Sequence, residues 1–170
     1  APLVKELYKQ TEFDTKVCVT AQHRELLDDV LELFDIKPDF DLNIMKPDQS
    51  LEDITSKILL KTKKVIKDIK PDMILVHGDT TTAMSVALAA FYNHIPVAHV
   101  EAGLRTFDKE SPFPEEMNRV ICDYLSDIHF VPIAKNKEYL NFKDTSEVTV
   151  DSGLVNNVIG QDEALEIIKK

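Results

Sequence analysis

Several residue types are scarce in this sequence, and each shortage excludes a class of protein. The 170 residues contain no tryptophan, two cysteines and four glycines. Two cysteines are too few for a disulfide scaffold. No G-x-G-x-x-G segment occurs, so this stretch of sequence lacks a dinucleotide-binding loop. No run of about 20 apolar residues occurs either, so we expect no membrane-spanning helix.

Positive charge is also in short supply. Lysine and arginine number 20 against 30 aspartates and glutamates, which gives a formal net charge of -10. Phosphate groups would be repelled over most of such a surface, so we expect neither a nucleic acid nor an anionic membrane as a partner. A single small anionic ligand in a local basic pocket is not excluded. The 44% hydrophobic content is enough for the core of one domain.

The two cysteines lie in apolar surroundings. Cys18 falls in a strand-like run and Cys122 in a helix-like one. We interpret both as buried thiols rather than as a disulfide or a nucleophile. No secretory signal peptide is recognisable, so the sequence predicts a reducing, cytoplasmic compartment.

Helix and strand signals alternate along the whole chain. This alternation predicts an α/β fold, a doubly wound open parallel sheet with helices on both faces. Strands are predicted at 17–20, 40–44, 73–76, 97–100, 128–131 and 148–150. Helices are predicted at 2–9, 22–34, from a capping box at Ser50 and Asp53 to about Ile69, and at 80–93, 114–125, 134–141 and 154–169.

Two of the predicted strands end in a carboxylate beside a glycine. Asp79 follows the strand at 73–76, and Glu101 follows the strand at 97–100. Ligands of a doubly wound sheet bind beyond the carboxyl ends of its strands, so we expect these two side chains at one rim. Asp79 could instead be a helix cap, with Thr80 as the other candidate. Glu101 has no obvious structural role.

A third cluster opens the helix at 114–125. Acidic residues in a first helical turn favour the helix dipole, which by itself explains Glu115 and Glu116. However, Glu115 and Arg119 are four residues apart and share a helix face. We expect this face to look into a cleft, opposite the predicted core stripe. That stripe consists of Met117, Val120, Ile121, Tyr124 and Leu125.

A metal site is the weaker interpretation of these strand ends. His77-x-Asp79 and His99-x-Glu101 each place two potential ligands on one side of an extended chain. Without a cysteine or a third spaced histidine, we expect the histidines to face the core or to bond to backbone, and we expect no metal. No G-x-S-x-G elbow is present. The polar rim suits acid–base chemistry on a polar, anionic ligand.

Five segments, in this order and spacing, resemble the non-hydrolysing UDP-N-acetylglucosamine 2-epimerases. They are Ala21-Gln22-His23-Arg24 and residues 39–45, 77–81, 99–106 and 111–119, and the resemblance extends from residue 1 to about residue 150. It implies a Rossmann-like half of a two-domain fold similar to GT-B glycosyltransferases. It also implies that residues 1–170 are the N-terminal domain, without the family's first strand and its C-terminal domain.

The resemblance implies a reaction as well. The family interconverts UDP-N-acetylglucosamine and UDP-N-acetylmannosamine by removing the C2 proton, eliminating UDP and adding it back, and it needs no cofactor. Asp79, Glu101 and Glu115 match its catalytic carboxylates, with the assignment of base and acid left open. The residues expected to bind substrate are Arg119, Arg105, His77 and Gln22.

The family context adds further expectations. It implies a homodimer in the complete protein, a role in cell-envelope polysaccharide synthesis, and no activity for this segment alone. Two alternatives stay open. One is a non-catalytic sugar-nucleotide-binding or regulatory domain, which a departure from the family pattern at 149–153 favours. The other is a hydrolysing relative that releases free N-acetylmannosamine and UDP.

Overall fold

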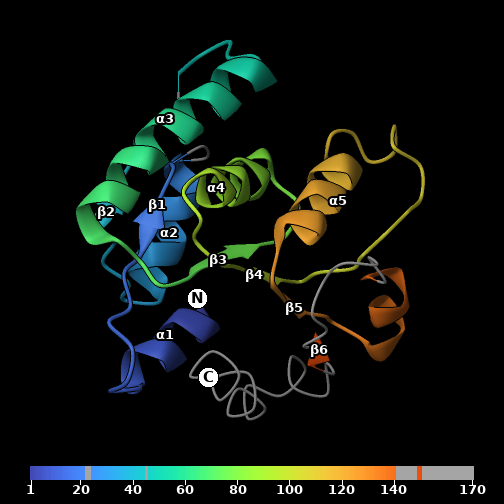
Figure 1. Ribbon diagram of the computed structural model, residues 1–170. Coiled ribbons are helices and arrows are strands. Elements are labelled where there is room, and N and C mark those ends of the chain that lie inside the picture. The colour runs from blue at the N-terminus through green and yellow to red at the C-terminus, as the bar shows by residue number, and fades with distance from the viewer. Residues whose placement is uncertain (22–23, 45, 141–148, 151–170) are drawn as a thin grey trace.

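The computed structural model describes residues 1–21, 24–44, 46–140 and 149–150 (Figure 1). Its helices are α1 (Pro2–Lys9), α2 (Arg24–Leu33), α3 (Leu51–Ile69), α4 (Thr81–Tyr92), α5 (Glu115–Leu125) and the 3-10 helix η1 (Ala134–Leu140). Its strands are β1 (Cys18–Val19), β2 (Phe40–Asp41), β3 (Ile74–His77), β4 (Val97–Val100), β5 (Ile128–Phe130) and β6 (Thr149–Val150). The predicted alternation is confirmed, and the helix predicted at 154–169 lies outside the described residues.

The larger sheet has four parallel strands in the order β3-β4-β5-β6. In its register His77 pairs with Val100, and His99 pairs with both Val76 and His129. The predicted neighbours, β3 and β4, therefore end side by side. The loops that follow them begin at the same edge of the sheet.

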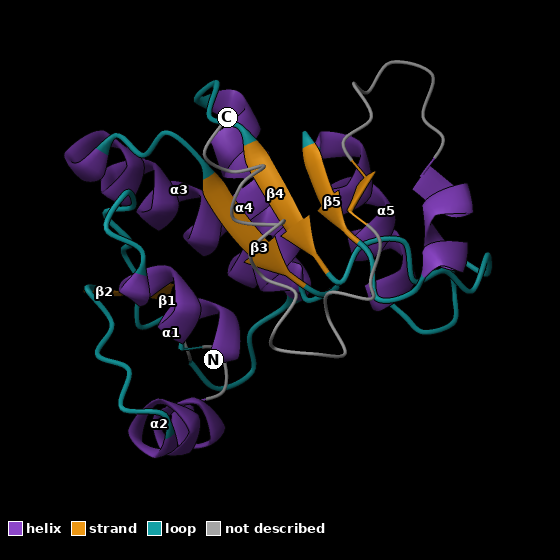
Figure 2. Cartoon of the chain, turned by 90° about the horizontal axis from the view of Figure 1, so that it is seen from below, coloured by secondary structure: helices purple, strands orange, loops and turns teal. Residues whose placement is uncertain are grey.

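A layer of helices covers one face of this sheet (Figures 1 and 2). Helix α4 lies on β3 and β4, α5 lies beside it on β4, and α3 packs against α4. The core under this layer combines the alanines of α4 with Val76, Val97 and Cys122. Small alanine side chains let α4 approach the sheet closely, which brings α5 and both strand ends together. On the opposite face, Ala98, Ile128 and Phe130 form a second cluster.

Strands β1 and β2 form a separate parallel pair. The sequence predicted one open sheet, whereas in the described residues these two-residue strands share no ladder with β3. Side chains join the two parts instead. The hydroxyls of Thr20 and Thr82 lie 3.3 Å apart, and Val86 of α4 packs on a cluster of Leu42, Ile44 and Ile58.

The predicted helix starts are confirmed at α3 and α4. The Ser50 hydroxyl accepts a hydrogen bond from the Asp53 amide at 3.2 Å, and the Asp53 carboxylate accepts one from the Ser50 amide. Thr80 caps α4 by accepting from the Ala83 amide at 3.2 Å. None of the helices that the structure describes is long and apolar enough to cross a membrane.

One cysteine prediction is confirmed and one is wrong. Cys122 is fully buried, whereas Cys18 is exposed. Successive side chains of a strand point to opposite sides, and in β1 the inward position is occupied by Val19. Burial, followed by the nearby Asp123 carboxylate, raises the pKa of the Cys122 thiol to about 12, so this thiol stays protonated.

The predicted core stripe of α5 is confirmed only in part: Leu125 packs against the core, and Val120 and Ile121 are partly buried. Met117 and Tyr124 are 40% and 64% exposed. The buried residues of this helix are Glu116, Asn118, Arg119, Cys122 and Asp123, most of which are polar or charged. Buried polar groups require hydrogen-bond partners, and the loops after β3 and β4 supply them.

Candidate active site

Asp79 and Arg119 form an ion pair at the carboxyl end of β3. The Asp79 carboxylate lies 2.5 Å from the Arg119 guanidinium, whose second amino group donates to the Glu101 carbonyl. The Arg119 side chain is 5% exposed and that of Asp79 is 33% exposed. Thr80 occupies the cap position of α4, so Asp79 does not act as the helix cap. Arg119 therefore joins the two strand ends.

Glu101 lies in an unusual backbone conformation. Its φ is +69°, a left-handed conformation that costs a residue with a side chain about 1 kcal/mol or more. Hydrogen bonds from the Glu101 and Ala102 amides to the Phe130 carbonyl hold it there. Its carboxylate lies over Gly78, where an added Cβ would be 3.3 Å from Oε2. The predicted meeting of the ends of β3 and β4 is confirmed.

Arg105 is held by a buried carboxylate. Glu116, whose side chain is 2% exposed, accepts from Arg105 at 2.7 Å and from the amides of Thr106 and Phe107. Burial acts to raise the pKa of Glu116, but these hydrogen bonds outweigh it and leave the pKa below its ordinary value. The guanidinium also lies 4.9 Å from the centre of the Phe107 ring. These contacts fix the loop after Glu101.

The remaining predicted residues lie around this edge. His77 is exposed, with its Nε2 3.9 Å from the Glu101 carboxylate. Glu115 begins α5 with a partly buried side chain, and among the described residues it makes no ion pair. Gln22 lies outside the described residues. The structure therefore brings Asp79, Glu101 and Arg119 into contact, with His77 next to Glu101.

Below this edge lies a buried polar group of which the sequence predicted one member. His99 faces the core and bonds to backbone as expected, whereas the same expectation is wrong for His77, which is exposed. His99 Nδ1 lies 2.6 Å from Asp123 Oδ1, and His99 Nε2 lies 2.8 Å from the Gly78 carbonyl. Asp123 Oδ2 accepts from the Gly103 amide at 3.2 Å. The available signal was the i, i+4 spacing of Arg119 and Asp123, which places both on one face of α5.

Two further side chains complete the buried group. Asn136 donates to the Gly103 carbonyl at 2.8 Å, and an added Cβ at Gly103 would lie 2.6 Å from the Asn136 carbonyl. His129 Nε2 lies 2.7 Å from the Asp123 carbonyl. Burial lowers the pKa of His129, so the neutral ring that donates to this carbonyl is favoured.

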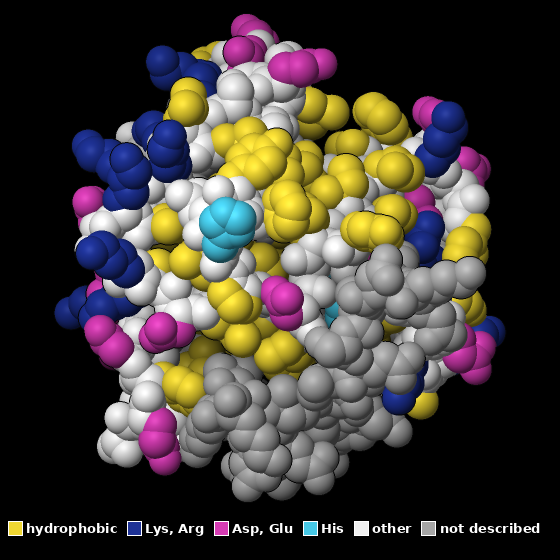
Figure 3. All heavy atoms as spheres, viewed as in Figure 1, with side chains coloured by type: hydrophobic (Ala, Val, Ile, Leu, Met, Phe, Trp, Pro, Cys, Tyr) yellow, Lys and Arg dark blue, Asp and Glu magenta, His cyan; other side chains and the backbone are white. Residues whose placement is uncertain are grey.

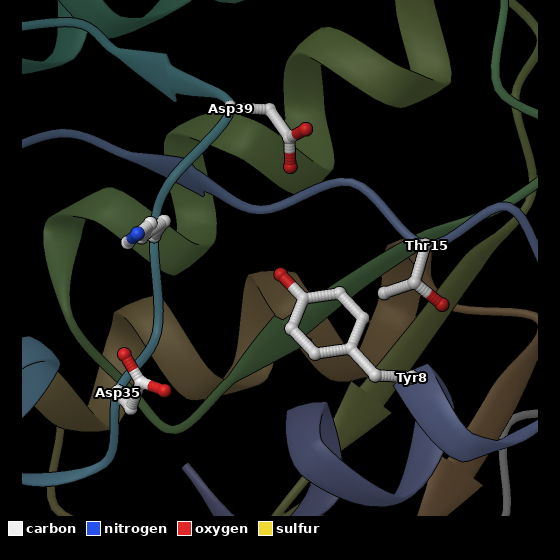
Figure 4. A pocket seen from close by; sticks show the side chains of 5 residues that line it. Tyr8, Thr15, Asp35 and Asp39 are labelled. Atoms are coloured by element: carbon white, nitrogen blue, oxygen red, sulfur yellow. The ribbon is translucent and has the colours of Figure 1, made fainter.

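A pocket of about 390 Å³ lies elsewhere, against helix α1 (Figure 4). It is lined by Tyr8, Thr15, Asp35, Lys37 and Asp39. None of the predicted site residues lines it. Among the described side chains, no group of three His, Cys, Asp or Glu is placed to hold a metal ion.

Fold and site together define a class: a Rossmann-like α/β protein with carboxylates and an arginine at the ends of two parallel strands. A family model described as UDP-N-acetylglucosamine 2-epimerase matches residues 5–151. The chain belongs to this family. It is 59% identical over 140 residues to the UDP-N-acetylglucosamine 2-epimerase of Bacillus subtilis and 56% identical to that of Escherichia coli K12. These matches cover 82% of this chain and 37% of each relative.

Solved structures of related proteins support the same family. The Neisseria meningitidis UDP-GlcNAc 2-epimerase bound to UDP-GlcNAc is 55% identical, with a TM-score of 0.79 over 82% of this chain and 38% of that one. The Methanocaldococcus jannaschii enzyme in complex with UDP-GlcNAc and UDP is 33% identical, with a TM-score of 0.81 over 99% of this chain and 46% of that one. The predicted class, a Rossmann-like half of a GT-B-like fold, is confirmed by these neighbours.

Proposed function

We propose that this chain forms the carboxylate-bearing part of an isomerase that interconverts UDP-N-acetylglucosamine and UDP-N-acetylmannosamine. The observation that carries the proposal is the convergence of Asp79, Glu101 and Arg119 at the ends of β3 and β4. Inverting C2 of the sugar requires a base on one face of the ring and an acid on the other. The UDP-GlcNAc-bound relative from Neisseria meningitidis supports the choice of ligand.

Glu101 is our candidate for proton transfer at C2. Its side chain is 42% exposed, and the Nε2 atom of His77 is 3.9 Å from its carboxylate. It is therefore open to a ligand in a way that the tightly paired Asp79 is not. Its left-handed backbone supports the same role, because such strain concentrates at functional sites.

Asp79 and Arg119 have a different role in this proposal. Arg119 is buried and bonds to both strand ends, so it acts on the reaction through the position of the carboxylates. Asp79 remains partly exposed and presents its outer edge to the ligand. Glu115, in the first turn of α5 and without an ion pair among the described residues, is the candidate for the proton on the opposite face of C2.

In the proposed reaction a carboxylate takes the C2 proton, and the electrons of the C–H bond form a C1–C2 double bond. The C1–O bond breaks, and UDP leaves with its electron pair. The 2-acetamidoglucal that remains takes UDP back at C1 and a proton on the other face of C2. Arg105, His77 and Gln22 are proposed as substrate contacts, with Arg105 fixed by Glu116.

The test uses a hybrid protein in which the 140 residues of this chain that match the Bacillus subtilis relative replace their counterparts in that protein. The hybrid is incubated with UDP-N-acetylglucosamine in deuterated water, and C2 is followed by proton NMR. We expect deuterium at C2 together with UDP-N-acetylmannosamine. Glu101→Gln should slow the exchange by at least about 100-fold. Glu110→Gln, at an exposed glutamate of the same loop, should leave it unchanged.

Two outcomes would contradict the proposal. Release of free N-acetylmannosamine and UDP would assign the chain to the hydrolysing relatives. A folded hybrid that binds UDP without exchanging C2 would assign it to non-catalytic sugar-nucleotide binding.

We also propose that the complete protein is a homodimer. Hydrophobic side chains gather over α4 and α5 on the face shown in Figure 3. Phe91, Tyr92, Met117 and Tyr124 of these helices are 40–65% exposed. Such a patch favours association with a second copy. Light scattering of the hybrid should give twice the mass of one chain, and the mass of one chain would contradict the proposal.

A further inference from the structure

Among the described residues, His99 and Asp123 form a fully buried ionisable pair that the proposed reaction does not use. Their side chains are 0% and 1% exposed. Removing charged or polar groups from water is costly unless hydrogen bonds compensate, so such a pair persists only where its contacts are well matched. The positions of its protons follow from the contacts of its four hydrogen-bonding atoms.

The contacts of His99 fix where its protons lie. The Gly78 carbonyl can only accept, so Nε2, 2.8 Å away, must carry a hydrogen. Nδ1 lies 2.6 Å from Asp123 Oδ1, and two bare acceptors cannot approach so closely without a proton between them. A distance this short favours a charge-assisted hydrogen bond, because such bonds are shorter than those between neutral groups.

The second oxygen of Asp123 also has a hydrogen-bond donor. Oδ2 accepts from the Gly103 amide, as a carboxylate does. The neighbouring ring, His129, donates to the Asp123 backbone carbonyl and leaves the carboxylate to His99 and Gly103. The contacts therefore require one hydrogen on Nε2 and one between Nδ1 and Oδ1, which an imidazole protonated on both nitrogens and an ionised aspartate would supply.

Each end of this pair reaches a loop of the candidate site. Gly78 precedes Asp79, Gly103 follows Glu101 by two residues, and Asp123 lies one helical turn from Arg119. Arg119 in turn binds Asp79 and the Glu101 carbonyl. The buried pair thus ties together all three groups whose relative positions the proposed reaction needs.

We propose that His99 and Asp123 form a positioning pair, a doubly protonated imidazole on a carboxylate, which sets the spacing of Asp79 and Glu101. Its catalytic consequence rests on the proposed function, whereas its proton count does not. Neither residue touches the substrate. Misplacing a reacting group by about 1 Å can cost roughly 100-fold in rate, which is the scale of effect expected here.

The proton count is tested on the chain itself, labelled with 15N-histidine. The His99 signals, identified by their loss in His99→Gln, should show a bonded proton on both ring nitrogens, with a strongly deshielded Nδ1 proton. A spectrum with one bare ring nitrogen would overturn the assignment. His94→Gln, at an exposed histidine, should leave the His99 signals in place.

The positioning role is tested by turnover of the hybrid. His99→Gln should lower kcat about 10- to 100-fold while KM for UDP-N-acetylglucosamine changes less than about 3-fold. Asp123→Asn, whose amide can donate to a neutral His99, should retain more kcat than Asp123→Ala. A folded His99→Gln or Asp123→Ala hybrid with unchanged kcat would overturn the role. An unsubstituted hybrid without turnover would contradict the proposed function and leave the NMR result standing.

Discussion

Helices α2 and α5 have similar lengths and similar apolar spacing, yet none of the described side chains of α2 is buried, whereas α5 buries mostly polar and charged ones. Helix α2 leaves Leu26 and Leu33 71% and 77% exposed. Helix α5 exposes Tyr124 and buries Arg119 and Asp123. Apolar spacing predicts a helix, but the partners available beside it decide which face is buried. Around α5 those partners are a histidine ring, a carboxylate and loop amides.

The largest difference between the two helices is expected when one arginine in each is replaced by methionine. Arg119→Met removes the group that joins the ends of β3 and β4, so kcat/KM of the hybrid should fall about 100- to 1,000-fold. Arg24→Met removes exposed ion pairs to Asp28 and Asp41 at the start of α2 and should change kcat/KM less than 2-fold. Equal losses would mean that both helices serve the site.

A second test compares carboxylates by stability. Glu116→Ala leaves the Arg105 guanidinium and two loop amides without their acceptor, so the free energy of unfolding should fall by about 3 kcal/mol. Asp28→Ala, in α2, should cost less than about 1 kcal/mol. Because the pKa of Glu116 is lowered by folding, its contribution is present above the ordinary carboxyl value and is lost as the pH falls. Urea unfolding at pH 7 measures the cost of each substitution, and the same measurement at pH 4 shows how much of the Glu116 contribution is lost.

The pH dependence of stability gives a third test. Folding lowers the pKa of His129, so below about pH 6.5 the unfolded chain binds this proton more readily than the folded chain does. The contribution is therefore complete above that pH and is lost as the pH falls. His129→Gln should flatten the stability profile between pH 7 and pH 5 by at most about 1.4 kcal/mol per pH unit. An unchanged slope would show that folding does not lower the pKa of His129.

The smallest effect is expected at the apolar face of α2. Leu33→Ser should change the free energy of unfolding by less than about 0.5 kcal/mol, because the side chain is already in solvent. The matched core change, Ile58→Ala at a fully buried position, should cost about 2–5 kcal/mol. A cost above 2 kcal/mol at Leu33 would show that this face is covered in solution.

Sequence patterns that depend only on neighbouring residues predicted most of the helices and strands. The caps at Ser50 and Thr80 and the apolar strand at 73–76 depend on neighbouring residues, so one sequence was enough to predict them. The rim formed by Asp79 and Glu101 could also be predicted, because parallel strands end at one edge of a sheet. The pairing of β1 with β2 could not, since the choice of strand partner depends on contacts that are distant in sequence.

The buried side of α5 could not be predicted for a related reason. A charged residue at a helical position normally indicates solvent, and only a partner elsewhere in the chain reverses that. Asp123 is buried because His99 and Gly103, 24 and 20 residues away, supply its hydrogen bonds. The predicted match of all seven residues to the family's site stays a prediction: Asp79, Glu101, Glu115, Arg119, Arg105, His77 and Gln22.

The His99 contact also has a consequence for how the sheet assembles. A slip of β4 by one residue would turn Ala98 or Val100 toward α5 and send the imidazole to the other face of the sheet. The Asp123 carboxylate would then be buried opposite a methyl or isopropyl group, with no counter-charge. A one-residue slip of the strand thus leaves a buried carboxylate without its histidine partner, so the His99 contact disfavours that alignment of β4 between β3 and β5.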